Sequence, residues 1–236
     1  MKNYITVNKV EKDIDFVNLI ITTKNIDAKN EEDLLNNFNK EEFNLANLTR
    51  NSQIHSSIVN KIDENNIGQK IDGDALITNV PKVPLLVLTA DCVPVVIIDP
   101  VNKAIGVAHA GWRGTYDEIS KKTIEEMNTN YNSNPKDLIC VIGPSIGPCC
   151  YEVSKDLVEK FNINLSNYTE KFDIIRDNKH YLDLWKINEL TLKDCNVKEE
   201  NIINLQICTN CNHDKFYSYR KHNKTSKRIG TMIQIR

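Results

Sequence analysis

The segment 88–114, LTADCVPVVIIDPVNKAIGVAHAGWRG, combines a long apolar run with three chemically active side chains. Cys92 stands near its start, and His109 and Arg113 stand near its end. A thiol with an imidazole is typical of nucleophilic catalysis or of a transition-metal site, and a guanidinium is a forked cation suited to phosphate. Asp91 adds a carboxylate, which is costly to bury without a partner. This segment is therefore the first candidate for a functional site.

The apolar runs predict an antiparallel hairpin that would hold the thiol and the imidazole together. We expect strands over 95–98 and 104–109 and a loop over 99–103. Pairing Ile98 with Ala104 would place His109 opposite residue 93, next to Cys92. Facing side chains have Cβ atoms about 4.5–5.5 Å apart, so the two groups would reach contact or share a metal ion. A five-residue loop also allows a one-residue shift, which would turn one of the two side chains to the other face.

The motif HAGWRG leads from this hairpin into a predicted helix. Thr115 and Glu118 fit a reciprocal capping box, which predicts that the helix begins at Thr115. Gly111 and Gly114 permit a tight turn, and Arg113 adds a cation, so the motif indicates an anion site suited to phosphate. The alternative is that Arg113 pairs with a surface carboxylate and that the glycines only form a turn.

Two further residues are candidates by type. His55 lies in QIHSSIV, where a single histidine is more often a hydrogen-bonded structural residue than a ligand. Arg220 lies in FYSYRK, which combines aromatic and basic residues able to stack on a flat base or to bind phosphate. The alternative for that segment is a strand that alternates core aromatics with solvated polar residues.

Four cysteines outside the hairpin form two short motifs. CTNCNHD, with Cys208, Cys211 and His213, resembles half of a zinc knuckle, but no second Cys-x-x-Cys or spaced histidine pair completes it. We therefore interpret its cysteines as thiols at a strand end. Cys149 and Cys150 are adjacent, and in an extended chain their side chains diverge, so at most one would face a given pocket.

Composition and patterning predict one cytoplasmic α/β (α+β) domain over residues 1–236. Hydrophobic residues make up 40% and charged residues 26%, as in soluble globular proteins, and no apolar run is long enough to span a membrane. The net charge of −2 gives no reason to expect nucleic acid or an anionic membrane as a partner. Seven cysteines without an export signal indicate free thiols or metal ligands. Strands are predicted at 16–23 and 137–143, and helices at 31–48, 154–161 and 183–195.

Taken together and in this order, six motifs resemble a known family. They are QIHSSIV, TADCVPVVIIDP, IGVAHAGWRG, IGPSIGPCCYEV, DLWKIN and FYSYRK, and they run from about residue 50 to the C-terminus. The chain resembles the bacterial laccase-domain proteins, the multicopper polyphenol oxidase-like family described as purine nucleoside phosphorylases. The resemblance implies a single domain with mixed β-sheets packed between helices, related to the toxin-type cysteine-hydrolase fold. One departure is ITTKNIDAKNEE, where the family commonly has a glycine-rich turn.

The resemblance also implies a metal site and a reaction. His55, Cys92 and His109 match the family's ligands for a metal that is usually zinc, with copper as the other possibility. The implied activity is cleavage of adenosine, inosine, guanosine and S-methyl-5′-thioadenosine by inorganic phosphate, with some deamination of adenosine. We expect the same three residues to be catalytic, Asp91 to carry protons, and Arg113 and Arg220 to bind phosphate or substrate. The expected partners are these small molecules, with no nucleic acid or membrane, and the expected state is a monomer or a homodimer.

Three other functions stay open at this point. Cys92 and His109 form a possible nucleophile–base pair of a cysteine hydrolase. Copper-dependent phenol oxidation ranks low, because one His/Cys/His cluster lacks the several copper sites that four-electron reduction of oxygen requires. A zinc-binding module without catalytic activity is the remaining alternative.

Overall fold

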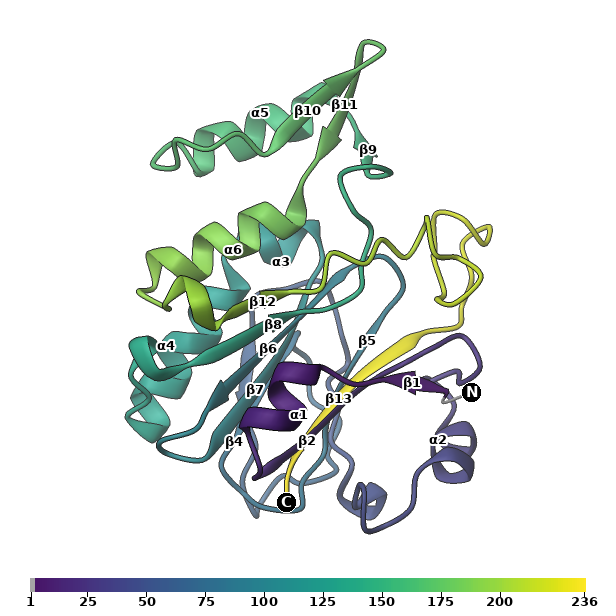
Figure 1. Ribbon diagram of the computed structural model, residues 1–236, viewed down its shortest axis with the longest axis vertical. Helices are drawn as coiled ribbons and strands as arrows, with labels where there is room; N and C mark the ends of the chain where they lie inside the picture. The colour runs from purple at the N-terminus through teal and green to yellow at the C-terminus, as the bar shows by residue number, and fades with distance from the viewer. Residues whose placement is uncertain (1–2) are drawn as a thin grey trace.

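A computed structural model describes residues 3–236, and its largest element is a six-stranded mixed β-sheet (Figure 1). The central strands β6 (Val93–Asp99) and β7 (Ala104–Ala110) are buried on both faces, which explains why the sequence there is apolar without alternation. In spatial order the strands are β12 (Ile202–Asn204), β8 (Ile139–Ile142), β6 (Val93–Asp99), β7 (Ala104–Ala110), β4 (Ala75–Thr78) and β3 (Val59–Lys61).

Two smaller sheets accompany it. The four-stranded antiparallel sheet contains β1 (Tyr4–Ile5), β2 (Val17–Thr22), β13 (Ile229–Ile235) and β5 (Leu85–Thr89). The three-stranded sheet contains β10 (Asp173–Arg176), β11 (Lys179–Leu182) and β9 (Glu152–Val153), and with α5 (Lys155–Asn164) it forms the projection at the top of Figure 1.

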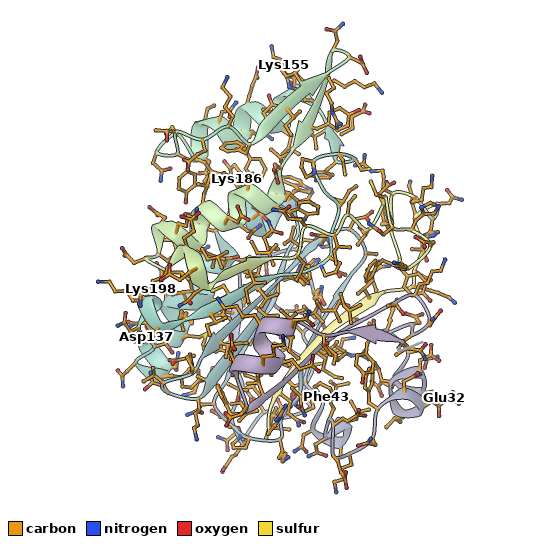
Figure 2. The ribbon with its side chains drawn as sticks, in the orientation of Figure 1. Glu32, Phe43, Asp137, Lys155, Lys186 and Lys198 are labelled. Atoms are coloured by element: carbon orange, nitrogen blue, oxygen red, sulfur yellow. The ribbon has the colours of Figure 1, made fainter. Side chains whose placement is uncertain are left out.

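The helices cover the outer faces of the two larger sheets. α4 (Ile119–Tyr131) and α6 (Leu184–Asp194) pack on the six-stranded sheet, and α2 (Glu31–Asn37) packs on the four-stranded sheet. Phe43 is buried in that second helical layer, whereas Glu32 of α2 lies at the periphery (Figure 2). The remaining elements are α1 (Asn8–Asp13), α3 (Trp112–Tyr116) and the short 3-10 turns Leu45–Asn47, Pro135–Asp137 and Glu199–Asn201.

A third apolar cluster lies between the two larger sheets. It joins residues such as Val96 and Ile105 of the six-stranded sheet to Leu85 and Ile233 of the four-stranded sheet. The predicted α/β architecture, with mixed sheets packed between helices, is thus confirmed. In the described part of the chain, each helix is too short or too polar to cross a bilayer.

The β6–β7 hairpin differs from the predicted register by one residue. Asp99 pairs with Ala104, so the connection has four residues, 100–103, in place of five, and His109 faces Pro94. The Asp99 carboxylate accepts the backbone N–H groups of Val101 and Asn102, both at 2.9 Å, which extends the strand to residue 99. Cys92 lies just before β6, outside the ladder.

The predicted capping box at Thr115 and Glu118 is wrong. α3 already begins at Trp112, and Thr115 lies inside it, with its N–H donating to the carbonyl of Gly111. The Thr115 hydroxyl is used in tertiary contacts, donating to Ala110 O and accepting from Asn188 Nδ2 at 3.1 Å. Glu118 has φ 55° and separates α3 from α4. A contact with distant α6 therefore overrides the local signal.

The other predicted helices and strands are present with shifted bounds, except that the segment FYSYRK forms no strand: Phe216 is buried there, but Tyr219 is exposed. The helix predicted over 31–48 ends as α2 at Asn37, and a 3-10 turn follows at Leu45–Asn47. Ser154 caps α5, its side chain accepting from the N–H of Leu157. β2, β8 and α6 lie within the segments predicted for them.

Candidate functional site

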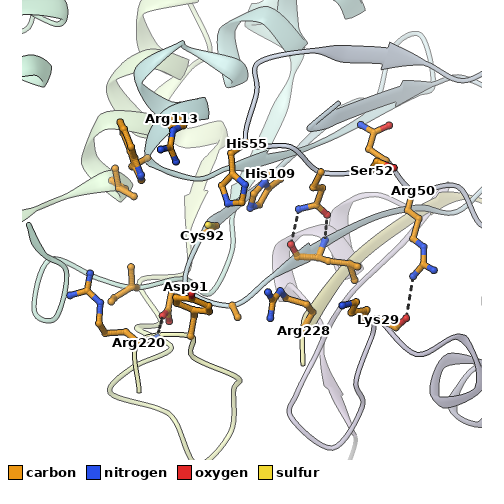
Figure 3. A pocket seen from close by; sticks show the side chains of 18 of the residues that line it. Lys29, Arg50, Ser52, His55, Asp91, Cys92, His109, Arg113, Arg220 and Arg228 are labelled. Atoms are coloured by element: carbon orange, nitrogen blue, oxygen red, sulfur yellow. Dashed lines mark hydrogen bonds between the residues drawn. The ribbon is translucent and has the colours of Figure 1, made fainter. Parts of the chain in front are cut away.

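A pocket of about 750 Å³ opens where the two larger sheets meet (Figure 3). The link 90–92 carries the chain from β5 of the four-stranded sheet to β6 of the six-stranded sheet, and Cys92 is its last residue. His109, near the end of β7, and His55, in the loop before β3, also line the pocket. The structure therefore brings the three predicted metal ligands to one wall.

The three side chains form a compact cluster. One ligand atom from each of His55, Cys92 and His109 lies within 4.8 Å of the others. The two imidazole rings meet edge to face, with centroids 5.0 Å apart. Gly111 makes room for this approach, since a Cβ there would lie 3.1 Å from the Cys92 sulfur and 3.3 Å from the His55 ring. One thiolate and two imidazoles with space for a further ligand match the donor set of a catalytic zinc site.

Asp74 organises this cluster from behind, and our sequence analysis did not identify it. Its carboxylate is fully buried and lies 2.8 Å from His109 Nδ1, which leaves Nε2 as the nitrogen available to the site. The same carboxylate accepts the backbone N–H groups of His55 and Ser56 at 3.1 and 2.6 Å. A carboxylate behind a metal-binding histidine fixes the ring and its tautomer. The available signal was an acid at the start of the apolar strand β4.

The charges of the cluster stabilise one another when no metal is bound. Burial alone would raise the pKa of Cys92, but the neighbouring His109 charge lowers the pKa to about 6. Burial would lower the pKa of His109, yet the Cys92 thiolate and the Asp74 hydrogen bond raise it to about 9. The His109 hydrogen bond and the Ser56 donors outweigh burial and lower the pKa of Asp74 to about 2. At neutral pH the metal-free cluster therefore consists of the Cys92 thiolate and the His109 imidazolium, with the Asp74 carboxylate hydrogen-bonded to the imidazolium.

Two residues of the site hold left-handed backbone conformations. Asp91 has φ 87° and His55 has φ 59°, each an arrangement that costs about 1–3 kcal/mol for a residue other than glycine. The Asp91 carboxylate accepts from Thr209 Oγ1 and from the backbone N–H of Arg220, both at 2.7 Å. These bonds, and those from Asp74 to the His55 segment, hold the strained link and loop in place. The role of Asp91 as a proton carrier stays a prediction.

The predicted anion-binding residues lie in the same pocket. Arg113 stacks on Trp112, with its guanidinium carbon 4.3 Å from the ring centroid, and Arg220 donates to the carbonyl of Glu152 at 3.2 Å. Sequence reasoning missed four other basic residues, which come from segments without a recognisable motif. These additional bases are Lys29, Arg50, Lys70 and Arg228. Asp91 is the only acid among the described lining residues, so the lining carries a net positive charge, although Arg50 also pairs with Glu31 at 2.8 Å.

Comparison with known proteins places the chain in a family. The model of the multi-copper polyphenol oxidoreductase laccase family matches residues 11–236. The chain belongs to this family. A purine nucleoside phosphorylase of Clostridium acetobutylicum is 36% identical over 213 residues, which cover 89% of this chain and 85% of that protein. A protein named adenosine deaminase RL5, from an unknown prokaryotic organism, is 35% identical over 201 residues, covering 80% and 75% of the two chains.

Solved structures of this laccase-like family share the fold. YlmD from Geobacillus stearothermophilus superposes with a TM-score of 0.85 at 26% identity and covers 95% of this chain and 94% of its own. YfiH from Bacillus licheniformis has the same fold, with a TM-score of 0.87 at 24% identity. The match covers 100% of this chain and 97% of that protein. The family resemblance expected from the six sequence motifs is confirmed.

Proposed function

We propose that this protein is a purine nucleoside phosphorylase that accepts adenosine, inosine, guanosine and S-methyl-5′-thioadenosine. The observation that carries the proposal is the positive pocket of about 750 Å³ with His55, Cys92 and His109 on one wall. The pocket has room for a nucleoside together with an anion. Relatives about 35% identical that are named purine nucleoside phosphorylase supply the substrate class.

In the proposed reaction, a phosphate oxygen forms a bond to C1′ of the ribose while the bond from C1′ to the purine nitrogen breaks. The bonding electron pair leaves with the purine, which takes up one proton. The products are the free base and ribose 1-phosphate, or 5-methylthioribose 1-phosphate from S-methyl-5′-thioadenosine. Negative charge develops on the purine and positive charge on the ribose. Arg113 and Arg220 are the proposed phosphate-binding residues, because both offer guanidinium groups to the same pocket as the cluster.

Zinc is the metal that we propose for the cluster. The donor set is one thiolate and two imidazoles, and the buried Asp74 behind His109 is the partner typical of zinc histidines. Bound zinc would supply a Lewis acid that stabilises negative charge on the substrate or on water. His55, Cys92 and His109 would hold it, while Asp74 keeps His109 Nδ1 protonated and Nε2 directed at the site.

Deamination of adenosine is the second candidate activity, and the adenosine deaminase relative favours it. Water would add to C6 of the purine, and ammonia would leave after proton transfer, which gives inosine. Asp91 is the proposed proton carrier because it adjoins Cys92 and lines the pocket. The same pocket would serve both reactions.

Incubation of the purified zinc-loaded protein with each nucleoside, with and without phosphate, tests both activities. Phosphorolysis predicts phosphate-dependent release of the base with an equal amount of the sugar 1-phosphate, both measured by chromatography. Deamination predicts inosine and ammonia from adenosine in either buffer. We expect Cys92→Ala and His109→Ala to lose roughly 10²–10⁴-fold in turnover. Cys195→Ala is the matched control, because Cys195 does not line the pocket.

Two results would overturn the proposal. Full turnover in both variants would show that the cluster is not the site. A covalent acyl–enzyme on Cys92, with no dependence on phosphate, would assign the protein to the cysteine hydrolases, for which the aligned Cys92, His109 and Asp74 side chains also provide a nucleophile, a base and an orienting acid.

A further inference from the structure

A second cysteine cluster lies away from the His55–Cys92–His109 site and takes no part in the proposed function. Cys149 and Cys150 come from the loop between β8 and β9, and Cys208 and Cys211 come from the segment after β12. The four sulfur atoms all lie within 4.8 Å of one another. Cys211 Sγ is 3.5 Å from Cys149 Sγ and 3.4 Å from Cys150 Sγ.

The sequence-based interpretation of these thiols is wrong on one point. Adjacent cysteines diverge only in an extended chain, and here the chain turns, with the N–H groups of Cys150 and Tyr151 both donating to Gly147 O. Cys149 and Cys150 therefore face the same partner. Gly147 is required in this turn, because a Cβ there would lie 2.5 Å from the Trp185 ring.

The sulfur arrangement fits one tetrahedral metal ion. Zinc–sulfur bonds of about 2.3 Å in a tetrahedron place sulfur atoms roughly 3.8 Å apart, between the shortest contacts here and the 4.8 Å limit. All four residues are free thiols. A disulfide would need the sulfurs to approach to about 2.05 Å, and it would use only two of the four.

Backbone donors already support a thiolate in the cluster. Cys208 Sγ accepts the N–H of Gly147 at 3.3 Å and that of its own motif partner Cys211 at 3.5 Å. Both donors point at a sulfur that a metal ion would bind, and hydrogen bonds of this kind orient metal ligands.

We propose that Cys149, Cys150, Cys208 and Cys211 bind a structural zinc ion. Four thiolates leave no open position for substrate, so the ion would hold structure and not catalyse. The ion would cross-link two loops that are about 60 residues apart in sequence. Cys208 already forms a β-bridge with Ser145, which the ion would reinforce.

The zinc would stabilise one side of the nucleoside pocket. Tyr151, directly after Cys150, lines that pocket. Thr209, directly after Cys208, donates to the Asp91 carboxylate at 2.7 Å. Loss of the ion would thus loosen Tyr151 and the link that carries Asp91 and Cys92, whereas Asp74 would still hold His55 and His109.

Metal analysis of the reduced, full-length protein loaded with zinc tests the proposal. We expect two zinc ions per chain in the wild type, one in His55→Ala/Cys92→Ala and one in Cys149→Ser/Cys211→Ser. The second variant should also melt at a lower temperature. Cys195→Ser is the matched control, because Cys195 is a partly buried cysteine outside both clusters, and it should keep two ions.

The His55→Ala/Cys92→Ala variant decides the question even if the cysteine variant does not fold. Its remaining ion should be released by a thiol-specific mercurial, and cobalt in its place should show the charge-transfer absorption of a tetrathiolate site. Failure of this variant to bind zinc would overturn the proposal, as would iron in place of zinc or a Cys149–Cys211 disulfide that forms equally fast with and without zinc. None of these readouts depends on nucleoside cleavage, so this proposal and the proposed function fail separately.

Discussion

At the scale of single residues, the candidate site depends on Asp74. This carboxylate orients the His109 ring through Nδ1 and fixes the backbone of the His55 segment, so one buried acid positions two of the three proposed ligands. Its full burial is offset by five hydrogen-bond donors, which are the three groups already named together with the Ile54 N–H and the Ser56 hydroxyl. The chemistry of the site therefore extends one layer behind the residues that face the pocket.

Replacing Asp74 by asparagine should weaken the site without removing a ligand. A neutral amide cannot stabilise the His109 imidazole in the same way, so we expect zinc affinity and turnover to fall by about 10–100-fold. Competition with a chromophoric chelator measures the affinity. The exposed Asp72→Asn is the control and should behave as wild type. Unchanged zinc affinity in Asp74→Asn would show that the carboxylate does not position the ligands.

Cys92 should react as a thiolate at unusually low pH in the metal-free protein. Because its pKa is about 6, below the ordinary 9.0, the alkylation rate with iodoacetamide should reach half its maximum near pH 6. Cys195, whose pKa burial raises to about 12, serves as the internal control in the same peptide map. His109→Ala should move the Cys92 midpoint upward, since the neighbouring charge is lost and burial remains. A midpoint for Cys92 near that of an ordinary cysteine would contradict the thiolate–imidazolium pair.

At the scale of elements, the β6–β7 hairpin shows what sequence can and cannot provide. Its apolar runs were enough to predict both strands and to bring Cys92 near His109. The register depends on whether Asp99 belongs to the strand or to the loop. Hydrogen bonds that its carboxylate accepts from the turn favour the strand. Asp74 was missed because its partners lie up to 35 residues away and share no local pattern with it. Local periodicity identifies elements, whereas long-range hydrogen bonds decide register and the outer layer of the site.

Asp99→Ala should destabilise the hairpin at neutral pH by about 1–3 kcal/mol, because the partly buried hydrogen bonds from the N–H groups of Val101 and Asn102 lose their acceptor. The Ser133 hydroxyl and the amide groups of Asn102 outweigh burial and hold the pKa of Asp99 below its ordinary 3.8. Its stabilising effect is therefore present above pH 3.8 and is lost as the pH falls through the folded-state pKa. Urea unfolding at neutral and at acidic pH should show the difference between wild type and variant shrinking on acidification. The exposed Asp15→Ala should show little difference at either pH; an equal effect of both substitutions would contradict the role of Asp99 in the turn.

At the scale of the whole molecule, the charge is unevenly distributed. The chain has a net charge of −2, yet six basic residues and one acid line the pocket. A positive cleft in a weakly acidic protein concentrates the field on the entering anion. Phosphate should be drawn to the site, whereas nucleosides, which are uncharged, should not.

This distribution predicts a selective effect of salt. Raising the ionic strength should increase the KM for phosphate several-fold, because ions screen charges beyond about 8–10 Å. The KM for inosine should change little under the same conditions and serves as the control. Potassium fluoride and potassium chloride should be compared at equal ionic strength to separate screening from competition by the anion. Equal effects on both substrates would show that the basic lining does not act on phosphate.

Because the pocket lies at the junction of two sheets, the proposed nucleoside-binding surface and the ligand cluster are built on different parts of the fold. One rim of the pocket contains Lys29, Leu88 and Arg228, from the part of the chain around the four-stranded sheet. The second rim contains His109, in β7 of the six-stranded sheet, and Arg113, in the helix that follows β7. Substitutions on the first rim can change which purine or sugar is accepted while the ligand cluster stays unaltered on the second. The two rims can therefore evolve at different rates, which offers a route by which one scaffold hosts both a phosphorylase and a deaminase among its relatives.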